Sequence, residues 1–323
     1  MRKSLIFLFL ILWFPSVNTI FAETPLKRVS LIPQWIPQAS FAGYIVALEK
    51  GFYLEAGIDL TLHEGGPDKS SFAQVSAGKA TFCSGWLAYA IEQRVSGLRV
   101  VNLARIIQRS ALMLVARKSS GIERPKDFNG KTVGLWEGQW RVQPRIFFHK
   151  FGVKVRIVPA YTSMNLLLKG GVDAITAMWY NEYHKILNSG LNPDELSLFF
   201  FSDFGLNMPE DGLYCMEETF KTDPQLCARF VQSSLKGWLY AFNHEDETVE
   251  LVMKHADAAH TGTNRAHQRW MLAHMKDLIM PGGDKNRLGK LRPEDYTHAG
   301  QLLKESGMID RLPRFDDFYV GSQ

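Results

Sequence analysis

Short apolar segments alternate with segments of helical periodicity along most of this 323-residue chain. KRVSLIPQW (27–35) has the composition of a buried strand, and Phe41, Tyr44 and Leu48 follow at i, i+3 and i+7, the spacing of one helix face. The alternation continues through IDLTLHEGG, KATFCSGW, ALMLVARKSSG, VRIVPAY, VDAITAM and LSLFFF, and the chain is mainly helical from Thr222 onward. Strands that alternate with helices form largely parallel sheets, so the sequence predicts an α/β fold.

The N-terminus predicts a cleavable signal peptide over residues 1–22. Arg2 and Lys3 precede an apolar run, Leu5 to Phe14, that is too short to span a bilayer. An uncleaved anchor is the alternative interpretation. No cysteine follows the run, so a lipid anchor is not expected. We therefore expect an exported protein that lies free in the periplasm.

Composition and motifs exclude several classes of function. The formal net charge is only +4 and there is no Lys/Arg block, so no nucleic-acid partner is expected. The three cysteines, Cys83, Cys215 and Cys227, lack CxxC spacing and predict no metal site, although a disulfide between the last two stays open. His267 and His274 lie seven residues apart and leave a surface zinc site as a minor alternative. No GxSxG, HExxH or Walker A motif is present.

Tryptophans follow the predicted strands in an unusual pattern. Trp35, Trp86, Trp136 and Trp179 each come directly after a strand, and Trp140 lies one turn beyond the third. Open α/β sheets bind ligands outside the carboxyl ends of their strands. A single tryptophan there is explained as well by the packing of its own core. Four together favour a shared aromatic pocket.

Several segments resemble the SsuA/THI5-like (NMT1/THI5) family of periplasmic binding proteins. The residues that carry the resemblance are WIPQASFAGYIVALEKGFYLEAGIDLTLHEGGPD, SAGKATFCSG, SGIERPKDFNGKTVG and LLLKGGVDAITAMWYNEYHKILNSG. The resemblance runs from about Val29 to about Tyr319. It implies a type 2 periplasmic-binding-protein fold, in which two α/β lobes close on a ligand about a hinge.

The resemblance also implies a division of the chain. Lobe I is expected over 24–112 and 213–323, and lobe II over 113–212. The crossings between them are expected near Ala111–Arg117 and Gly212–Glu217. The expected protein is a monomer that delivers its ligand to an ABC transporter permease at the inner membrane. A sensor that docks on a membrane receptor is the alternative.

Members of the family bind sulfonates, taurine, nitrate, or precursors of thiamine or riboflavin. Trp, Tyr, Gln, Asn and one carboxylate suit a flat, nearly neutral heteroaromatic ring: Trp179 and Tyr180 would stack, while Asn181 and Glu182 would read polar atoms. We therefore predict a thiamine pyrimidine precursor of the hydroxymethylpyrimidine or formylaminopyrimidine type, with riboflavin, sulfonate, taurine or nitrate as alternatives. A solvated helix-start role is the alternative for Glu182. The predicted ligand-binding residues are Trp35, Gln38, Phe41, Tyr44, Ser84, Trp86, Trp136, Gln139, Trp179, Tyr180, Asn181 and Glu182.

An enzyme is the remaining alternative. Eukaryotic relatives include thiamine pyrimidine synthase, which holds pyridoxal phosphate on a lysine and consumes a nearby histidine. In the matching segment GKATFCSGWLAYA, Gly85 stands at the lysine position and Tyr89 at the histidine position. Only Cys215 represents the cysteine-rich iron-binding run. The resemblance therefore implies a binding protein that uses no cofactor and no metal.

Overall fold

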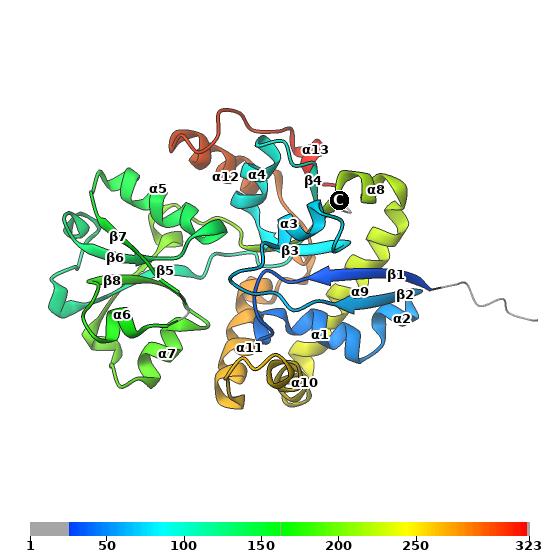
Figure 1. Cartoon of the computed structure of the whole chain (residues 1–323), viewed down its shortest axis with the longest axis horizontal. Coiled ribbons are helices and arrows are strands. Elements are labelled where there is room, and N and C mark those ends of the chain that lie inside the picture. Colours follow the sequence, from blue (N-terminus) through cyan, green and yellow to red (C-terminus); the bar gives the residue numbers. More distant parts are fainter. Residues whose placement is uncertain (1–25, 162, 322–323) are drawn as a thin grey trace, which may run out of the picture.

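The computed structural model describes residues 26–161 and 163–321, and the predicted signal peptide lies outside these ranges. Two five-stranded sheets form the centres of two separate lobes, with the green segments of Figure 1 on one side and the blue, yellow and orange segments on the other. The predicted α/β fold is confirmed. Within the described ranges, no helix is both long enough and apolar enough to cross a membrane.

We call the unit built on β1 lobe I. Its strand order is β2-β1-β3-β10-β4, and β10 runs antiparallel to both of its neighbours, while β1 pairs in parallel with β2 and β3. The strands are β1 (Lys27–Ile32), β2 (Ile58–Leu62), β3 (Phe82–Trp86), β4 (Val100–Arg105) and β10 (Asp211–Met216). The helices are α1 (Ala42–Glu49), α2 (Phe52–Glu55), α3 (Ser71–Ser76), α4 (Leu87–Val95), α8 (Glu217–Thr222), α9 (Pro224–Asn243), α10 (Glu245–Ala258), α11 (Arg265–Ile279), α12 (Pro293–Glu305) and α13 (Phe315–Phe318).

The unit built on β6 is lobe II. Its order, β7-β6-β8-β5-β9, repeats the pattern of lobe I, with one antiparallel strand in the fourth position. The strands are β5 (Leu112–Arg117), β6 (Thr132–Leu135), β7 (Arg156–Pro159), β8 (Ala174–Met178) and β9 (Leu196–Phe200). The helices are α5 (Val142–Phe151), α6 (Asn165–Leu168) and α7 (Glu182–Asn188), with the 3-10 turn η4 (Gly138–Arg141) before α5.

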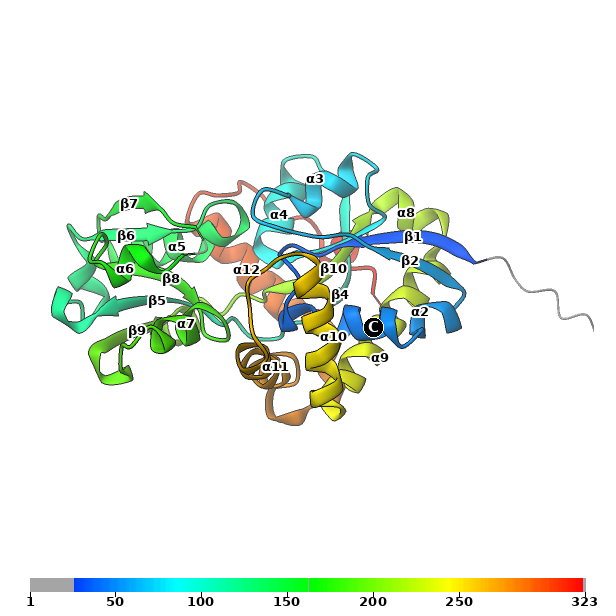
Figure 2. The same ribbon diagram turned by 60° about the horizontal axis from the view of Figure 1, so that its bottom comes forward.

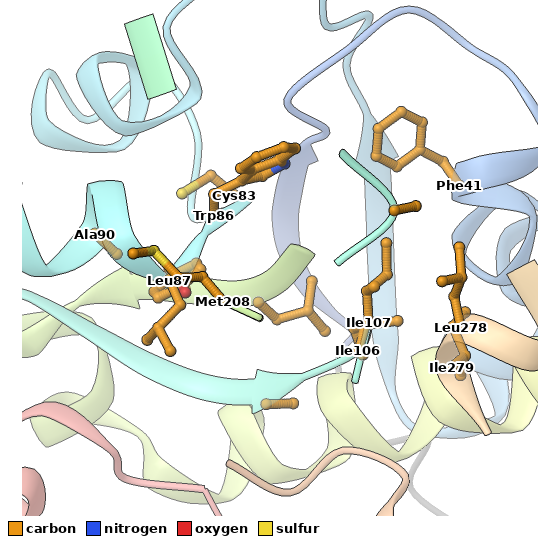
Figure 3. Close-up of a cluster of buried hydrophobic side chains, with 14 of the residues drawn as sticks. Phe41, Cys83, Trp86, Leu87, Ala90, Ile106, Ile107, Met208, Leu278 and Ile279 are labelled. Carbon is orange, nitrogen blue, oxygen red and sulfur yellow. The ribbon is translucent and has the colours of Figure 1, made fainter. Parts of the chain in front are cut away.

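The chain passes between the sheets through residues 106–111 and 201–210, and each passage leads directly into the antiparallel strand of the next sheet. The segments expected to be crossings are largely strands β5 and β10 themselves, because their apolar residues are buried within the two sheets. The predicted lobe boundaries stay a prediction. Ile106, Ile107 and Met208 of the passages join the apolar cluster that contains Leu87 and Leu278 (Figure 3).

Close helix packing fixes the start of α1 beside the cavity described below. Trp238 of α9 is fully buried against Gly43 of α1, where an added Cβ would lie 2.3 Å from the indole Cγ. An added Cβ at Gly237 would lie 2.0 Å from the backbone carbonyl oxygen of Gly43. Two glycines therefore let α9 approach α1 closely, which positions Phe41 and Tyr44 at the N-terminal end of α1.

Helix α11 lies on the face of lobe I that is turned toward lobe II. Figures 1 and 2 both show this helix at the side of lobe I that is turned toward α7. α11 begins with an Asn264 N-cap, whose side chain accepts a hydrogen bond from the backbone N–H of His267. The cap fixes the first turn of α11, and with it the position of His267.

Candidate ligand-binding site

A cavity of about 450 Å³ lies between the lobes, where strands β1, β3, β6 and β8 end. This is the sheet edge at which open α/β folds bind ligands. Lobe I lines it with Gln34, Trp35, Gln38, Ser40, Phe41 and Trp86. Lobe II lines it with Trp136, Trp140, Met178, Tyr180, Asn181 and Glu182.

Aromatic rings from both lobes meet at the cavity wall. The Trp35 ring lies edge-on to that of Trp140, with centroids 4.9 Å apart, and so joins lobe I to lobe II. The Trp136 indole N–H donates to the carbonyl oxygen of Tyr161 (3.1 Å), which holds this ring in place. Rings fixed in this way offer flat apolar faces to a planar ligand.

A buried amide forms the polar floor on lobe I. Gln34 Nε2 donates to Asp211 (2.9 Å), and the backbone N–H of Gln34 donates to the Ser84 hydroxyl (3.1 Å). The Tyr44 hydroxyl donates to the other oxygen of Asp211 (3.2 Å). Burial raises the pKa of Asp211 to about 8. Among the described residues, Gln34 Oε1 has no hydrogen-bond partner, so this acceptor is available to a donor on a ligand.

Asn181 and Glu182 form the polar edge on lobe II. Glu182 is only 3 % exposed at the start of α7 and is not a solvated helix-start residue. Its carboxylate accepts from the backbone N–H of Met178 (3.1 Å) and from Asn181 Nδ2 (2.6 Å). Burial raises the pKa of Glu182. Each carboxylate oxygen keeps a second lone pair that can accept from a ligand.

A carboxylate also connects the two passages between the lobes. Glu210 accepts from the Ser110 hydroxyl (2.8 Å) and from the backbone N–H of Leu112 (3.0 Å). Burial raises the pKa of Glu210 to about 7. Since Ser110 lies in the first passage and Glu210 in the second, the Glu210 side chain connects the two segments.

The model of the family described as "NMT1/THI5 like" matches residues 38–248. The chain belongs to this family. It is similar to the riboflavin-binding protein RibY of Chloroflexus aurantiacus, with 23 % identity over 93 % of this chain and 88 % of that protein. It is also similar to a formylaminopyrimidine-binding protein of Halalkalibacterium halodurans, with 21 % identity over 79 % of each chain.

Solved structures confirm the periplasmic-binding-protein fold of this NMT1/THI5-like chain. The aliphatic sulphonate binding protein SsuA of Escherichia coli superposes with a TM-score of 0.69 at 14 % identity, covering 90 % of this chain and 95 % of that one. The desulfurization enzyme DSZB shares the fold as well, with a TM-score of 0.60 at 16 % identity over 91 % and 97 % of the chains. The fold by itself therefore does not separate binding from catalysis.

Eight of the twelve residues predicted for the site line the cavity: Trp35, Gln38, Phe41, Trp86, Trp136, Tyr180, Asn181 and Glu182. Tyr44, Ser84 and Gln139 lie behind the lining and hold it in place. Tyr44 and Ser84 position the Gln34 network, and Gln139 Oε1 accepts from the backbone N–H of Trp86 (3.0 Å). These three residues contact lining groups, so their predicted direct contact with the ligand stays a prediction.

Trp179 is the fourth predicted residue outside the lining. Its ring packs edge-on against His274 of lobe I (4.2 Å) and Phe200 (6.2 Å). Met178 and Tyr180, its neighbours in the chain, both line the cavity. Trp179 lies one residue beyond the end of β8, in the turn before α7, and its side chain packs against α11 instead of lining the cavity.

Four lining residues were missing from the predicted set: Gln34, Ser40, Trp140 and Met178. Trp140 and Met178 carried a sequence signal, because one lies a turn beyond a strand end and the other is the last residue of β8. Gln34 and Ser40 carried none, since a glutamine and a serine in a loop are ordinary surface residues in sequence terms. Gln34 is held by Ser84 and Asp211, which lie far along the chain, and the 3-10 turn that carries Ser40 packs against α11.

The lining offers little to a metal or an anion. No Lys, Arg or His is among the described residues that line the cavity. The described ranges also contain no group of three His, Cys, Asp or Glu side chains placed to hold a metal ion. Cys83, Cys215 and Cys227 are free and buried. The cavity therefore combines aromatic faces with hydrogen-bond acceptors and a single carboxylate.

Packing restricts Gly85, the position that the resemblance to the eukaryotic synthase matches to a lysine. Over a 108-residue stretch, the chain is 28 % identical to the 4-amino-5-hydroxymethyl-2-methylpyrimidine phosphate synthase of Legionella pneumophila, covering 33 % of this chain and 34 % of that one. At Gly85, an added Cβ would lie 2.4 Å from the Phe72 ring. A larger side chain there requires Phe72 to move.

Proposed function

We propose that this NMT1/THI5-like protein is the solute-binding component of an ABC importer and binds a thiamine pyrimidine precursor of the hydroxymethylpyrimidine or formylaminopyrimidine type, without turnover. The observation that carries the proposal is the pairing of aromatic walls with buried acceptors. Trp86 and Tyr180 supply apolar surface, while Gln34 Oε1 and Glu182 supply acceptors. An aminopyrimidine presents a flat ring and N–H donors, and so complements both.

The charges of the lining argue against the anionic alternatives. A sulfonate or nitrate ion would lie beside Glu182 with no basic side chain among the described lining residues. Like charges at short distance are unfavourable, and burying an unpaired charge costs several kcal/mol. Sulfonate, taurine and nitrate are therefore weaker candidates than a neutral ring.

Riboflavin is the second candidate, and two observations favour it. RibY of Chloroflexus aurantiacus is similar over 93 % of this chain. A second, polar cavity of about 790 Å³ also adjoins the first and shares Gln38 and Asn181 with it. Lys185, Asn188 and Asn264 are among its lining residues and could accommodate a hydroxylated chain attached to the ring.

The proposal of binding without turnover rests on the packing around Gly85 and on the named relatives. Most of the length of this chain is similar to proteins named for binding, whereas the similarity to the synthase covers a third of it. Export by the predicted signal peptide would place the protein where an importer collects its ligand. A receptor in place of a permease is the alternative partner, and this proposal extends to either.

A thermal-shift screen tests the ligand class. The mature protein is mixed with hydroxymethylpyrimidine, formylaminopyrimidine, thiamine, riboflavin, taurine and nitrate. A ligand present at 100 times its dissociation constant adds about 2.7 kcal/mol to the free energy of unfolding. We expect the pyrimidines to raise the melting temperature most. A shift with taurine or nitrate and none with any heterocycle would overturn the proposal.

A further inference from the structure

α11 presents an aromatic face to lobe II. His267, Trp270 and His274 lie at i, i+3 and i+7 on this helix. The ring of His184, on α7 of lobe II, stacks parallel to the Trp270 ring with centroids 4.5 Å apart. The two facing histidines, His184 and His267, bring their Nδ1 atoms within 2.8 Å of each other. These contacts join the lobes beside the cavity.

A chain of hydrogen bonds leads from this contact into the cavity. His267 Nε2 lies 2.9 Å from Asn181 Oδ1. Asn181 Nδ2 donates to the Glu182 carboxylate (2.6 Å), which leaves Asn181 Oδ1 as an acceptor. His267 Nε2 must therefore carry a hydrogen, and its Nδ1 is then an acceptor for the Nδ1–H of His184. One neutral form of each imidazole satisfies every bond in the chain.

We propose that His267 is a positioning residue of the ligand site, which acts from lobe I through Asn181 to set the donors and acceptors that lobe II presents to the ligand. This inference rests on the proposed function, because it concerns the polar edge that reads a heteroaromatic ligand. When the lobes separate, Asn181 Oδ1 loses the hydrogen bond from His267, and the side-chain amide of Asn181 is free to rotate by about 180° and exchange its oxygen and nitrogen. Closure therefore completes the polar edge of the cavity as well as covering the ligand.

We call the hydrogen-bond chain from His184 through His267 and Asn181 to Glu182 the relay. Burial and the neighbouring charges both keep His267 in the neutral form that the relay requires. The residue is 5 % exposed. Burial lowers its pKa to about 4, and the neighbouring Lys185 and His184 add to the effect. Glu182, the carboxylate on this path, is separated from the imidazole by Asn181. A neutral His267 with one N–H is what Asn181 Oδ1 needs.

Two substitutions at position 267 test whether His267 acts through its hydrogen bond to Asn181 or only through its packing. In His267→Gln, the side-chain amide nitrogen replaces Nε2 and keeps the donor for Asn181. In His267→Asn, the shorter side chain reaches the Nδ1 position and loses that donor. His274→Gln is the matched control, because His274 packs on Trp179 and Trp270 in the same contact between lobes, and its Nδ1 bonds to the carbonyl oxygen of Trp270 rather than to Asn181.

Isothermal titration with two ligands then tests the proposal. The probes are the pyrimidine that binds best and its analogue without the amino group. We expect His267→Gln to bind both nearly as the wild type does. His267→Asn should weaken the amino-bearing ligand by about 5- to 150-fold and its analogue by clearly less. His274→Gln should weaken both by the same factor. Equal losses in His267→Gln and His267→Asn, or equal losses of the two ligands in His267→Asn, would overturn the proposal.

Imidazole ¹⁵N spectra at neutral pH provide a test that needs no identified ligand, applied to the closed form in which the His184 ring stacks on the Trp270 ring. The proposal requires His267 to carry its hydrogen on Nε2 and requires the Asn181 side-chain amide to be protected from exchange in the wild type but not in His267→Asn. A hydrogen on Nδ1 of His267 overturns the relay whatever the ligand is. If the spectra show the expected form and no heterocycle binds, the proposed function fails and the relay stands.

Discussion

The lobes meet on two sides of the cavity, through contacts of opposite character. The ion-pair contact consists of Glu92 and Trp86 on lobe I with Arg141 and Gln139 on lobe II: Arg141 pairs with Glu92 at 3.1 Å, and Gln139 accepts from the Trp86 backbone. The relay contact consists of His267 on lobe I with His184 and Asn181 on lobe II, and its imidazoles are neutral.

The two contacts end in different places. The ion pair between Glu92 and Arg141 lies outside the residues that line the cavity, whereas the relay ends on Asn181 and Glu182, which both line it. We infer that the ion-pair contact contributes to closure for any ligand. The relay contact adds a dependence on the polar atoms of the ligand. Strength of closure and choice of ligand are thus separable by substitution.

The largest expected effect is at the cavity end of the relay. Glu182→Gln replaces a charged double acceptor with one neutral acceptor and an NH₂ group. Met178 N–H and Asn181 Nδ2 already use the acceptor side, so the amino group of the ligand then faces a mismatched donor. A buried unsatisfied group costs about 1–3 kcal/mol, so affinity for an aminopyrimidine should fall about 5- to 150-fold by isothermal titration.

The ligand without the amino group provides the control for Glu182→Gln. Its affinity should change little, because it has no donor to lose. Unchanged binding of the aminopyrimidine to Glu182→Gln would remove this carboxylate from the site and leave only the aromatic part of the proposal.

Acid should weaken the relay contact next. Burial lowers the pKa of both His267, to about 4, and His184, so opening of the lobes takes up protons as the pH falls below about 6.5. If His267 regains an ordinary pKa when the lobes open, closure loses up to about 30-fold between pH 7.5 and pH 5. Isothermal titration across this range should show affinity falling toward acid.

His267→Gln, which cannot take up this proton, identifies the titrating group. Lys185 and His274 also face this contact. The lowered pKa of His184 and the raised pKa of Glu182 both mean that protonation of these groups weakens binding toward acid. Those contributions persist in His267→Gln. An identical pH profile in the variant and the wild type would show that His267 does not carry the dependence.

The apolar part of the relay contact should matter less. Trp179→Ala removes an edge-on contact with His274, and such ring pairs contribute about 0.5–1.5 kcal/mol beyond their buried area. Affinity should fall about 2- to 12-fold, by the same factor for ligands with and without the amino group. A loss of affinity that differs between the two ligands would indicate that Trp179 contacts the ligand directly, as the sequence predicts.

The fold and the aromatic pocket were predictable because they follow from local rules. Alternating strands and helices gave the α/β architecture, and the strand-end rule placed Trp35, Trp86 and Trp136 together. The rule misassigned Trp179 because it identifies the sheet edge and not the direction of a side chain. Near the end of β8, a shift of one residue decides between the cavity and the contact with α11.

The relay could not be predicted from the sequence. His184 and His267 are 83 residues apart, and His267 and Asn181 are 86 apart. No local periodicity links them, since they belong to different lobes. The spacing of His267 and His274 indicated a common helix face. It suggested a zinc site, because nothing in the sequence shows that α7 of lobe II packs against this face. The same holds for Gln34, which Asp211 and Ser84 hold from distant strands.

The smallest effect is expected at the ion-pair contact, where Arg141→Gln removes the charge that faces Glu92. The Arg141 side chain is 29 % exposed, and partly exposed pairs contribute about 0.2–1 kcal/mol. Burial already raises the pKa of Glu92, so this carboxyl can take up a proton when its partner is lost. Affinity should fall by no more than about fivefold, equally for ligands with and without the amino group.

Salt should act on this contact in the same sense, because screening weakens charged pairs more than bonds between neutral groups. In the wild type, raising the salt concentration should reduce affinity slightly, and Arg141→Gln should remove most of that dependence while leaving the acid dependence of the relay unchanged. Glu92→Gln should reproduce Arg141→Gln, since each removes the same pair. Titrations of both variants at low and high salt check this. A change in the preference for the amino-bearing ligand in either variant would mean that the ion pair also reaches the polar edge, and the two contacts would no longer be separable.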